Sequence, residues 1–186
     1  MIDLETTGVG IKNNNIIEIA VIALDKHLAL KSTLTIPVRL NGRAKWGKEA
    51  EEVHKISEEA ARHQGYLLTE AIDQIDEFIA EHYDKPPIPC GFNVHFDMKL
   101  IETAYEKKKR KHPFSHMIHE LNSIGRTFFD KNSSRHLVPH LGIEVDEKKK
   151  HRALYDCTQS LKTLHRLERV KWKLIKTYYR RSEQKA

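Results

Sequence analysis

Two carboxylates lie near the start of the chain, at Asp3 and Glu5, with one residue between them. In an extended strand, residues two apart point to the same face. Neighbouring carboxylates repel each other unless a cation lies between them, and hard oxygen ligands suit Mg²⁺ or Mn²⁺. A lone Asp-x-Glu is more often the polar end of a strand. The pair therefore predicts a metal site only if the rest of the sequence supplies further ligands.

Two later segments carry further carboxylates. Asp97 follows a short apolar run over residues 88–92, which predicts a buried strand, and it lies where a helix begins. Asp156 lies in the first turn or so of a long helix predicted from Ala153, five residues after His151. His151 is then expected on the loop before that helix. Binding sites are usually built at such ends of strands and helices.

Together these segments resemble the three motifs of the DEDDh exonucleases, the DnaQ-like group with a ribonuclease-H-like fold. The matching residues are Asp3-Leu4-Glu5-Thr6-Thr7-Gly8, Asn93-Val94-His95-Phe96-Asp97 and His151-x-Ala153-x-x-Asp156. They occur in the family's order and span most of the chain. A weaker match is Val53-His54-Lys55-Ile56-Ser57, which resembles a family segment that helps to hold the terminal nucleotide. The family includes ribonuclease T, oligoribonuclease and the proofreading subunits of replicative polymerases.

The resemblance implies an α/β fold with a ribonuclease-H-like mixed sheet of about five strands, flanked by helices on both sides. It also implies that two divalent ions, Mg²⁺ or Mn²⁺, are held by four carboxylates, and that His151 takes a proton from the attacking water. The four carboxylates are Asp3, Glu5, Asp97 and Asp156. The residues expected to contact the substrate are Thr6, Thr7, His54, Asn93 and Phe96.

Elementary chemistry agrees with these roles. Attack on a phosphodiester adds negative charge to an already anionic group, so a cluster of cations is a natural stabiliser. Two metal ions about 4 Å apart can stabilise both the attacking and the leaving oxygen. Histidine exchanges protons near neutral pH and can therefore serve as the general base.

The sequence departs from the family pattern in one place. Family members usually have four or more apolar residues before the first Asp, whereas only Met1 and Ile2 precede Asp3 here. Either the first strand is truncated, or the numbering begins inside a longer product.

Periodicity predicts the elements around these motifs. Residues 13–24 and 30–38 read as a hairpin that turns at residues 25–27, and Glu18 lies inside its apolar run without an evident role. We expect residues 49–63 to be helical. Thr69 is expected to cap a further helix that buries Ala71, Ile72, Ile75, Phe78 and Ile79. Shorter helices are expected at 121–129 and 135–141. The long helix from Ala153 carries an apolar stripe of Cys157, Leu161, Leu164 and Leu167.

Length and composition limit the alternatives. The 186 residues suit one domain, and the composition, 39% hydrophobic and 31% charged, is that of a globular protein. The chain has no apolar run long enough to cross a bilayer, and its two cysteines form no paired motif, which fits a reducing cytoplasm. His112, His116 and His119 have the spacing of zinc ligands, but histidines with this spacing are more often exposed polar residues than ligands.

Charge is concentrated at the C-terminus. Residues 162–186 hold nine Lys or Arg and two Glu, a net charge of +7, which leaves −1 for the rest of a chain that totals +6. The basic segment from about residue 171 suits a polyanionic partner, or it is a solvated helix face.

The leading prediction is a single exonuclease domain over residues 1–186. It would hydrolyse single-stranded DNA or RNA from a free 3′ end to 5′-mononucleotides. The alternatives are a proofreading or accessory subunit docked on a polymerase, and a catalytically silent nucleic-acid-binding module of the same fold. A polymerase or a second copy of the chain would be further partners.

Overall fold

A three-stranded antiparallel sheet forms the centre of the computed structural model, which describes residues 1–8, 14–42 and 44–183, with side chains up to residue 173. Its strands are β1 (Ile2–Thr6), β2 (Ile16–Leu24) and β3 (Leu30–Pro37), in the order β1-β2-β3. The predicted hairpin is confirmed as β2 and β3. Asp25 shapes the turn, because its Oδ1 accepts hydrogen bonds from the backbone N–H groups of His27 and Ala29.

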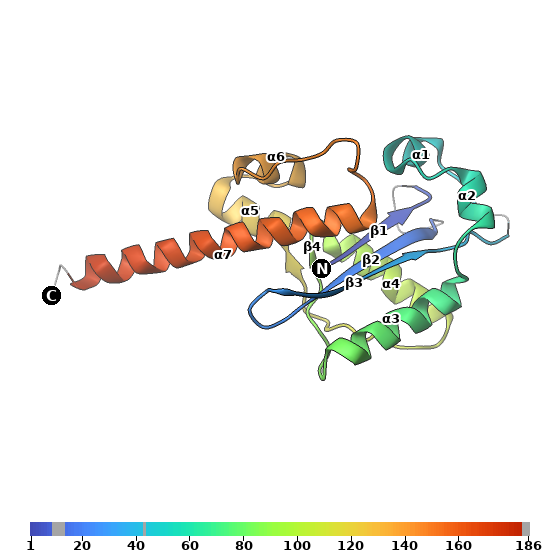
Figure 1. The fold of residues 1–186 in the computed structure, drawn as a ribbon, viewed down its shortest axis with the longest axis horizontal. Helices are drawn as coiled ribbons and strands as arrows, with labels where there is room; N and C mark the ends of the chain where they lie inside the picture. The colour runs from blue at the N-terminus through green and yellow to red at the C-terminus, as the bar shows by residue number, and fades with distance from the viewer. Residues whose placement is uncertain (9–13, 43, 184–186) are drawn as a thin grey trace.

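The two faces of the sheet are covered by different helices (Figure 1). On one face Ile2 and Leu4 pack against α3 (Leu68–His82) and α4 (Val94–Lys107). On the other face Met1 packs with α7 (Ala153–Glu183). Because side chains alternate along a strand, Asp3 and Glu5 lie on the α7 side, opposite Ala20 and Glu18 of β2.

A two-stranded parallel sheet of β4 (Cys90–Gly91) and β5 (His119–Glu120) lies beside β1. The approach is close, because a Cβ on Gly91 would lie 2.9 Å from the carbonyl oxygen of Ile2. β4 is shorter than the strand predicted over residues 88–92. Pro89 has no N–H to donate to a ladder, and Ile88 is 51% exposed.

Residues 49–63, which were predicted to be helical, form two helices with a break at residues 55–57. α1 (Lys48–His54) ends where Lys55 adopts a left-handed conformation with φ of 60°. α2 (Glu58–His63) then starts at Ser57, whose side chain accepts a hydrogen bond from the backbone N–H of Ala60. The break arises because the serine satisfies a free helix N–H group and thereby favours a new helix start.

The helix that Thr69 was expected to cap begins two residues earlier, with Leu67 as its N-cap. The Glu70 carboxylate accepts the Leu67 N–H, a bond that satisfies the helix start without the threonine. The predicted buried stripe of α3 is confirmed: Ala71, Ile72, Ile75, Phe78 and Ile79.

The remaining helices follow the predicted order. α5 (Leu121–Phe129) and α6 (Ser134–His140) precede α7, and α5 packs against both α6 and α7. The apolar stripe of α7 is buried against β1 and β2 as far as Leu167, whereas Lys171, Trp172 and Lys173 are exposed. Figure 1 shows the C-terminal part of α7 extending away from the rest of the molecule.

The basic segment expected from about residue 171 therefore continues this helix. The side chains of residues 174–186 lie outside the described part of the chain. Among the described helices, none combines the length and the apolar character that a membrane span requires.

Candidate active site

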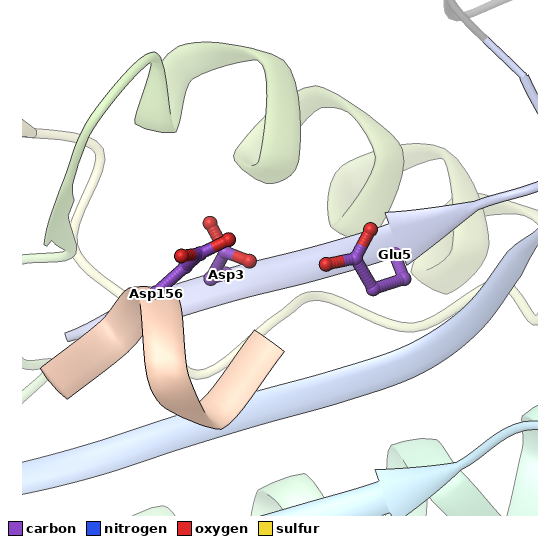
Figure 2. Close-up of side chains that lie close together, drawn as sticks. All are labelled: Asp3, Glu5 and Asp156. Carbon is purple, nitrogen blue, oxygen red and sulfur yellow. The ribbon is translucent and has the colours of Figure 1, made fainter. Parts of the chain in front are cut away.

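Three carboxylates from distant parts of the chain converge on the α7 side of the sheet. Asp3 and Glu5 come from β1 and Asp156 from the first turn of α7, and one oxygen of each lies within 4.8 Å of the others (Figure 2). Within the described residues, no other group of three His, Cys, Asp or Glu side chains is this close, so His112, His116 and His119 do not form one. The spacing is short enough for a single ion to touch all three side chains.

Burial and mutual repulsion make this cluster costly when it is fully ionised. Burial raises the pKa of Asp3 well above its ordinary value, and the charges of Asp97 and Glu5 add to the effect. The pKa of Glu5 rises to about 8, first through burial and then through Asp156 and Glu18. Burial likewise raises the pKa of Asp156. The site therefore favours either protons or a compensating cation.

The fourth predicted carboxylate, Asp97, approaches β1 from the first turn of α4. Its Oδ1 accepts a hydrogen bond of 3.1 Å from the backbone N–H of Leu4, the residue between Asp3 and Glu5. Burial raises the pKa of Asp97 to about 8, against the lowering effect of its backbone hydrogen bonds. Asp97 is thus fixed to the strand that carries the other two acids, and its charge acts on Asp3.

This set of donors fits divalent metal ions of the hard, oxygen-preferring kind. Four carboxylates gather with raised pKa values, and Arg152 is the cation that lowers the pKa of Glu5. Buried acids of one sign are seldom left without a compensating charge. The arrangement can therefore hold cations and bring them to an anionic substrate.

His151 lies on the loop directly before α7, as the sequence predicts, and is half-buried. Its backbone N–H donates to Oδ2 of Asp156 at 3.1 Å. Its φ of 60° places it in the left-handed region, which a residue with a side chain seldom adopts. The loop is therefore held in a specific conformation next to the acid cluster.

A hollow of about 830 Å³ lies beside Glu5 and contains three of the residues expected to contact substrate. It is lined by Thr6, Thr7 and His54. Its other lining residues include Lys45, Trp46 and Lys48. His54 is only 2% exposed, and burial lowers its pKa, which favours the neutral imidazole. Its Nδ1 accepts the backbone N–H of Ile56.

The threonines are also part of the local structure. The Thr7 hydroxyl accepts the backbone N–H of Asn15, and the Thr6 hydroxyl donates to the carbonyl of Gly8. These bonds shape the turn at the end of β1. The hollow begins at that turn, so the same residues that end the strand also form one wall of the hollow.

The other two expected substrate residues lie at the start of α4, and neither belongs to the described lining of that hollow. Asn93 is the exposed N-cap of α4 with a left-handed φ of 57°, and its backbone N–H donates to Glu120 of β5. Phe96 is half-buried and packs against the core shared with α4. They lie on the Asp97 side of the site.

Two residues at the site were not expected from sequence. Glu18 is buried and pairs with Arg152 of the His151 loop, whereas sequence reasoning gave it no role. The available signal was a charged residue inside an apolar strand, because a buried charge requires a partner. Trp46, which makes an edge contact with His54, lies in a segment without a recognisable pattern.

Known proteins share the fold of this chain. A family model described as "Exonuclease", RNase_T, matches residues 1–164. No curated protein gives a significant match to the sequence. Solved structures with the same fold include exonuclease I of E. coli in complex with a dT13 oligonucleotide, at 17% identity and a TM-score of 0.75. That match covers 95% of this chain but 42% of the E. coli chain, so this chain spans well under half of that enzyme.

A smaller relative is covered almost completely. The nuclease domain of 3′hExo, a DEDDh family member bound to rAMP, matches at 15% identity with a TM-score of 0.76, over 90% of both chains. A 3′-exonuclease that recognises the histone mRNA stem-loop matches at 17% identity with a TM-score of 0.74, over 90% of this chain and 80% of that one. The ribonuclease-H-like α/β fold and the DEDDh resemblance are thereby confirmed. The expected mixed sheet of about five strands is instead, in the described residues, a three-stranded antiparallel sheet and a two-stranded parallel sheet. The chain belongs to the RNase_T family of exonucleases.

Proposed function

We propose that this protein is a metal-dependent 3′–5′ exonuclease that hydrolyses single-stranded DNA or RNA to 5′-mononucleotides. One observation carries the proposal. Asp3, Glu5 and Asp156 offer oxygens within 4.8 Å of one another, and Asp97 is bonded to the same strand. A cluster of buried acids of this kind is expensive to form without a cationic ligand. Family membership supports the same reaction class.

Asp3, Glu5, Asp97 and Asp156 would hold two divalent ions, Mg²⁺ or Mn²⁺. When bound, such ions supply positive charge to the attacking and leaving oxygens of an in-line displacement. The carboxylates themselves orient that charge. The alternation of side chains along β1 fixes Asp3 and Glu5 on one face. Asp97 is fixed by its bond to the Leu4 N–H, and Asp156 by its place in the first turn of α7.

His151 is the proposed general base. It lies on the loop before α7, and its backbone N–H is bonded to Asp156 of the acid cluster. A neutral imidazole there takes a proton from water as the water attacks phosphorus. Asp156 then stabilises the imidazolium that forms, because it is the neighbouring acid.

The hollow beside Glu5 would receive the terminal nucleotide. Thr6, Thr7 and His54 line it near the acids, and Lys45 and Lys48 supply cations that can contact phosphate. Trp46 offers an aromatic surface on which a base can stack. Asn93 and Phe96 would contact the strand from the α4 side.

The decisive experiment uses oligomers labelled at the 5′ end, as DNA and as RNA, with Mg²⁺, with Mn²⁺ and with a chelator. We expect stepwise shortening that requires the metal and that is prevented by a blocked 3′ end but not by a blocked 5′ end. Asp156→Asn is the matched inactive control. Cutting of a circular single strand would instead show an endonuclease. Retention of the strand without any product in either metal would support the silent binding module.

Partners beyond nucleic acid stay predictions. A polymerase would co-purify with the tagged protein, and a homodimer would show twice the monomer mass in size-exclusion chromatography with light scattering. A cytoplasmic location likewise stays a prediction, which a fluorescent fusion tests.

A further inference from the structure

Glu18 is a buried carboxylate that the proposed reaction does not use. It lies in the middle of the apolar strand β2, is 4% exposed and stands opposite Glu5 in the β1–β2 register. Burying a carboxylate is costly unless the charge is paired and its oxygens accept hydrogen bonds. The partners of Glu18 therefore indicate what it stabilises.

Those partners are two consecutive residues at the end of the His151 loop. Oε1 of Glu18 accepts from Nη2 of Arg152 at 2.5 Å, and Oε2 accepts from Nε of Arg152 at 3.3 Å. Oε2 also accepts the backbone N–H of Ala153 at 2.9 Å, the first residue of α7. One strand carboxylate thus holds both a side chain and the backbone of this loop, across 134 and 135 residues of sequence.

Asp156 holds the same loop from the helix side. Its Oδ2 accepts the N–H of His151 at 3.1 Å, and its own N–H donates to the carbonyl of Arg152 at 3.0 Å. Residues 151, 152 and 153 are therefore each tied to a carboxylate-bearing residue. His151 sits between these ties with a φ of 60°. A residue with a side chain keeps such a conformation only where the surrounding bonds fix it, because its Cβ then lies too close to the following carbonyl oxygen.

We propose that Glu18, acting through Arg152 and the Ala153 N–H, is a positioning residue for His151. It keeps His151 in the left-handed conformation, with the backbone N–H of His151 bonded to Asp156. The inference rests on the proposed function, since it assigns Glu18 to the placement of the general base.

A purely structural role would be to stabilise the start of α7. α7 has 31 residues, and its N-terminal half packs against β1 and β2 through buried side chains. One bond at its first residue therefore contributes little to the existence of the helix. The two roles differ in one measurable respect: a positioning residue matters only while the residue that it positions is present.

The test is a double-mutant cycle with Glu18→Gln and His151→Ala. Glu18→Gln keeps the side-chain shape and one acceptor oxygen but removes the charge that pairs with Arg152. We expect it to lower kcat about 10- to 100-fold at saturating substrate and Mn²⁺, as groups that orient a catalytic side chain commonly do. In the His151→Ala background the same substitution should change kcat less than about twofold.

Two further variants make the cycle sharper. Arg152→Lys keeps the positive charge but not the two-point contact. It should therefore lower kcat less than Glu18→Gln does, and it should not lower kcat in the His151→Ala background. Arg110→Gln is the matched control, because Arg110 forms an ion pair with Asp73 and Asp76 far from this loop. It should leave kcat unchanged in both backgrounds.

A readout independent of turnover is hydrogen exchange in the presence of a chelator. Glu18→Gln should speed the exchange of the Ala153 and His151 amides, while the amides in the middle of β2 keep the wild-type rate. Equal loss of kcat with and without His151 in an active enzyme would overturn the positioning role alone. Unchanged exchange at both amides would also overturn it. An inactive wild type would overturn the proposed function, and the exchange rates would then decide whether Glu18 holds the loop.

Discussion

The two ends of α7 are built from different physical interactions. At the N-terminal end, Asp156 lies in a buried cluster and its carboxylate bonds the loop before the helix. Toward the other end, the last side chains that the structure describes are exposed: Lys171, Lys173 and Trp172, which is 58% exposed. Of the net charge of +7 in residues 162–186, +5 belongs to residues 171–186.

This contrast shows that net charge and burial carry different information. A buried charge interacts strongly, because little water lies between it and its neighbours. An exposed charge is screened by salt within about 10 Å at 0.1 M ionic strength. We therefore expect substitutions at the inner end to change chemistry and substitutions at the outer end to change only salt-sensitive binding.

The largest effect is expected for Asp156→Asn, which keeps the shape of the side chain but removes its charge. Activity should fall about a thousandfold or more, because the charge that holds the cation is lost. Asp3→Asn, Glu5→Gln and Asp97→Asn should behave alike, with the fold intact by circular dichroism. Near-normal turnover with normal metal dependence in any one of them would remove that residue from the site.

His151→Ala should reduce kcat about a hundredfold, because the variant lacks the group that accepts the proton. The metal concentration for half-maximal activity should change little, since the histidine is not a proposed ligand. The wild type should also lose activity in acid more steeply than the variant, because protonated imidazole cannot act as a base. A variant that lost metal binding but kept its rate at saturating metal would reverse this role.

Without metal, the stability of the protein should depend on pH, because of the buried acids at the inner end of α7. The pKa of Glu5 rises from 4.5 in the unfolded chain to about 8 in the folded one. The folded state therefore holds a proton that the unfolded state releases, and stability is lost as pH rises from 4.5 to 8. In a chelator, the melting temperature should fall by about 5 °C or more between pH 5 and pH 8.

Asp156→Asn supplies the control for this pH dependence. Asp156 is the strongest charge that raises the pKa of Glu5 after burial itself, so its neutralisation should flatten the fall. Mn²⁺ should restore wild-type stability at pH 8 but affect the variant less. Equal slopes in the two proteins would show that the two acids do not share one site.

The smallest effect is expected at the outer end. Truncation after Thr177 removes Arg180, Arg181 and Lys185. If this segment follows the strand, the slope of log affinity against log salt should flatten by up to about 2, at roughly 0.7 for each lost phosphate contact. Binding is measured in Ca²⁺ to suppress cleavage. An unchanged slope and affinity would assign strand binding to the cleft and leave this end of α7 to structure or to a protein partner.

Sequence spacing predicted where the acids and the histidine lie in the fold, because the period of a strand and the start of a helix depend on neighbouring residues. Asp3 and Glu5 share a face through the two-residue period of a strand, and His151 precedes Asp156 by the distance from a loop to a first helical turn. The division of residues 49–63 into α1 and α2 was missed, because Lys55 adopts a conformation that its residue type does not predict. The early start of α3 was missed because Glu70, not Thr69, satisfies the helix start.

The sequence by itself determined which residues could hold a cation, since the residue types and the alternation of a strand are local properties. It also determined the family, through three motifs in order. Only the tertiary structure decided that Glu18 pairs with Arg152 and that the hollow beside Glu5 includes Trp46 and His54. These contacts join segments that are far apart in the chain, and their partners are set by how β2, α1 and α7 pack around the sheet. Pairing across such distances depends on the packed fold, which no short stretch of residues specifies.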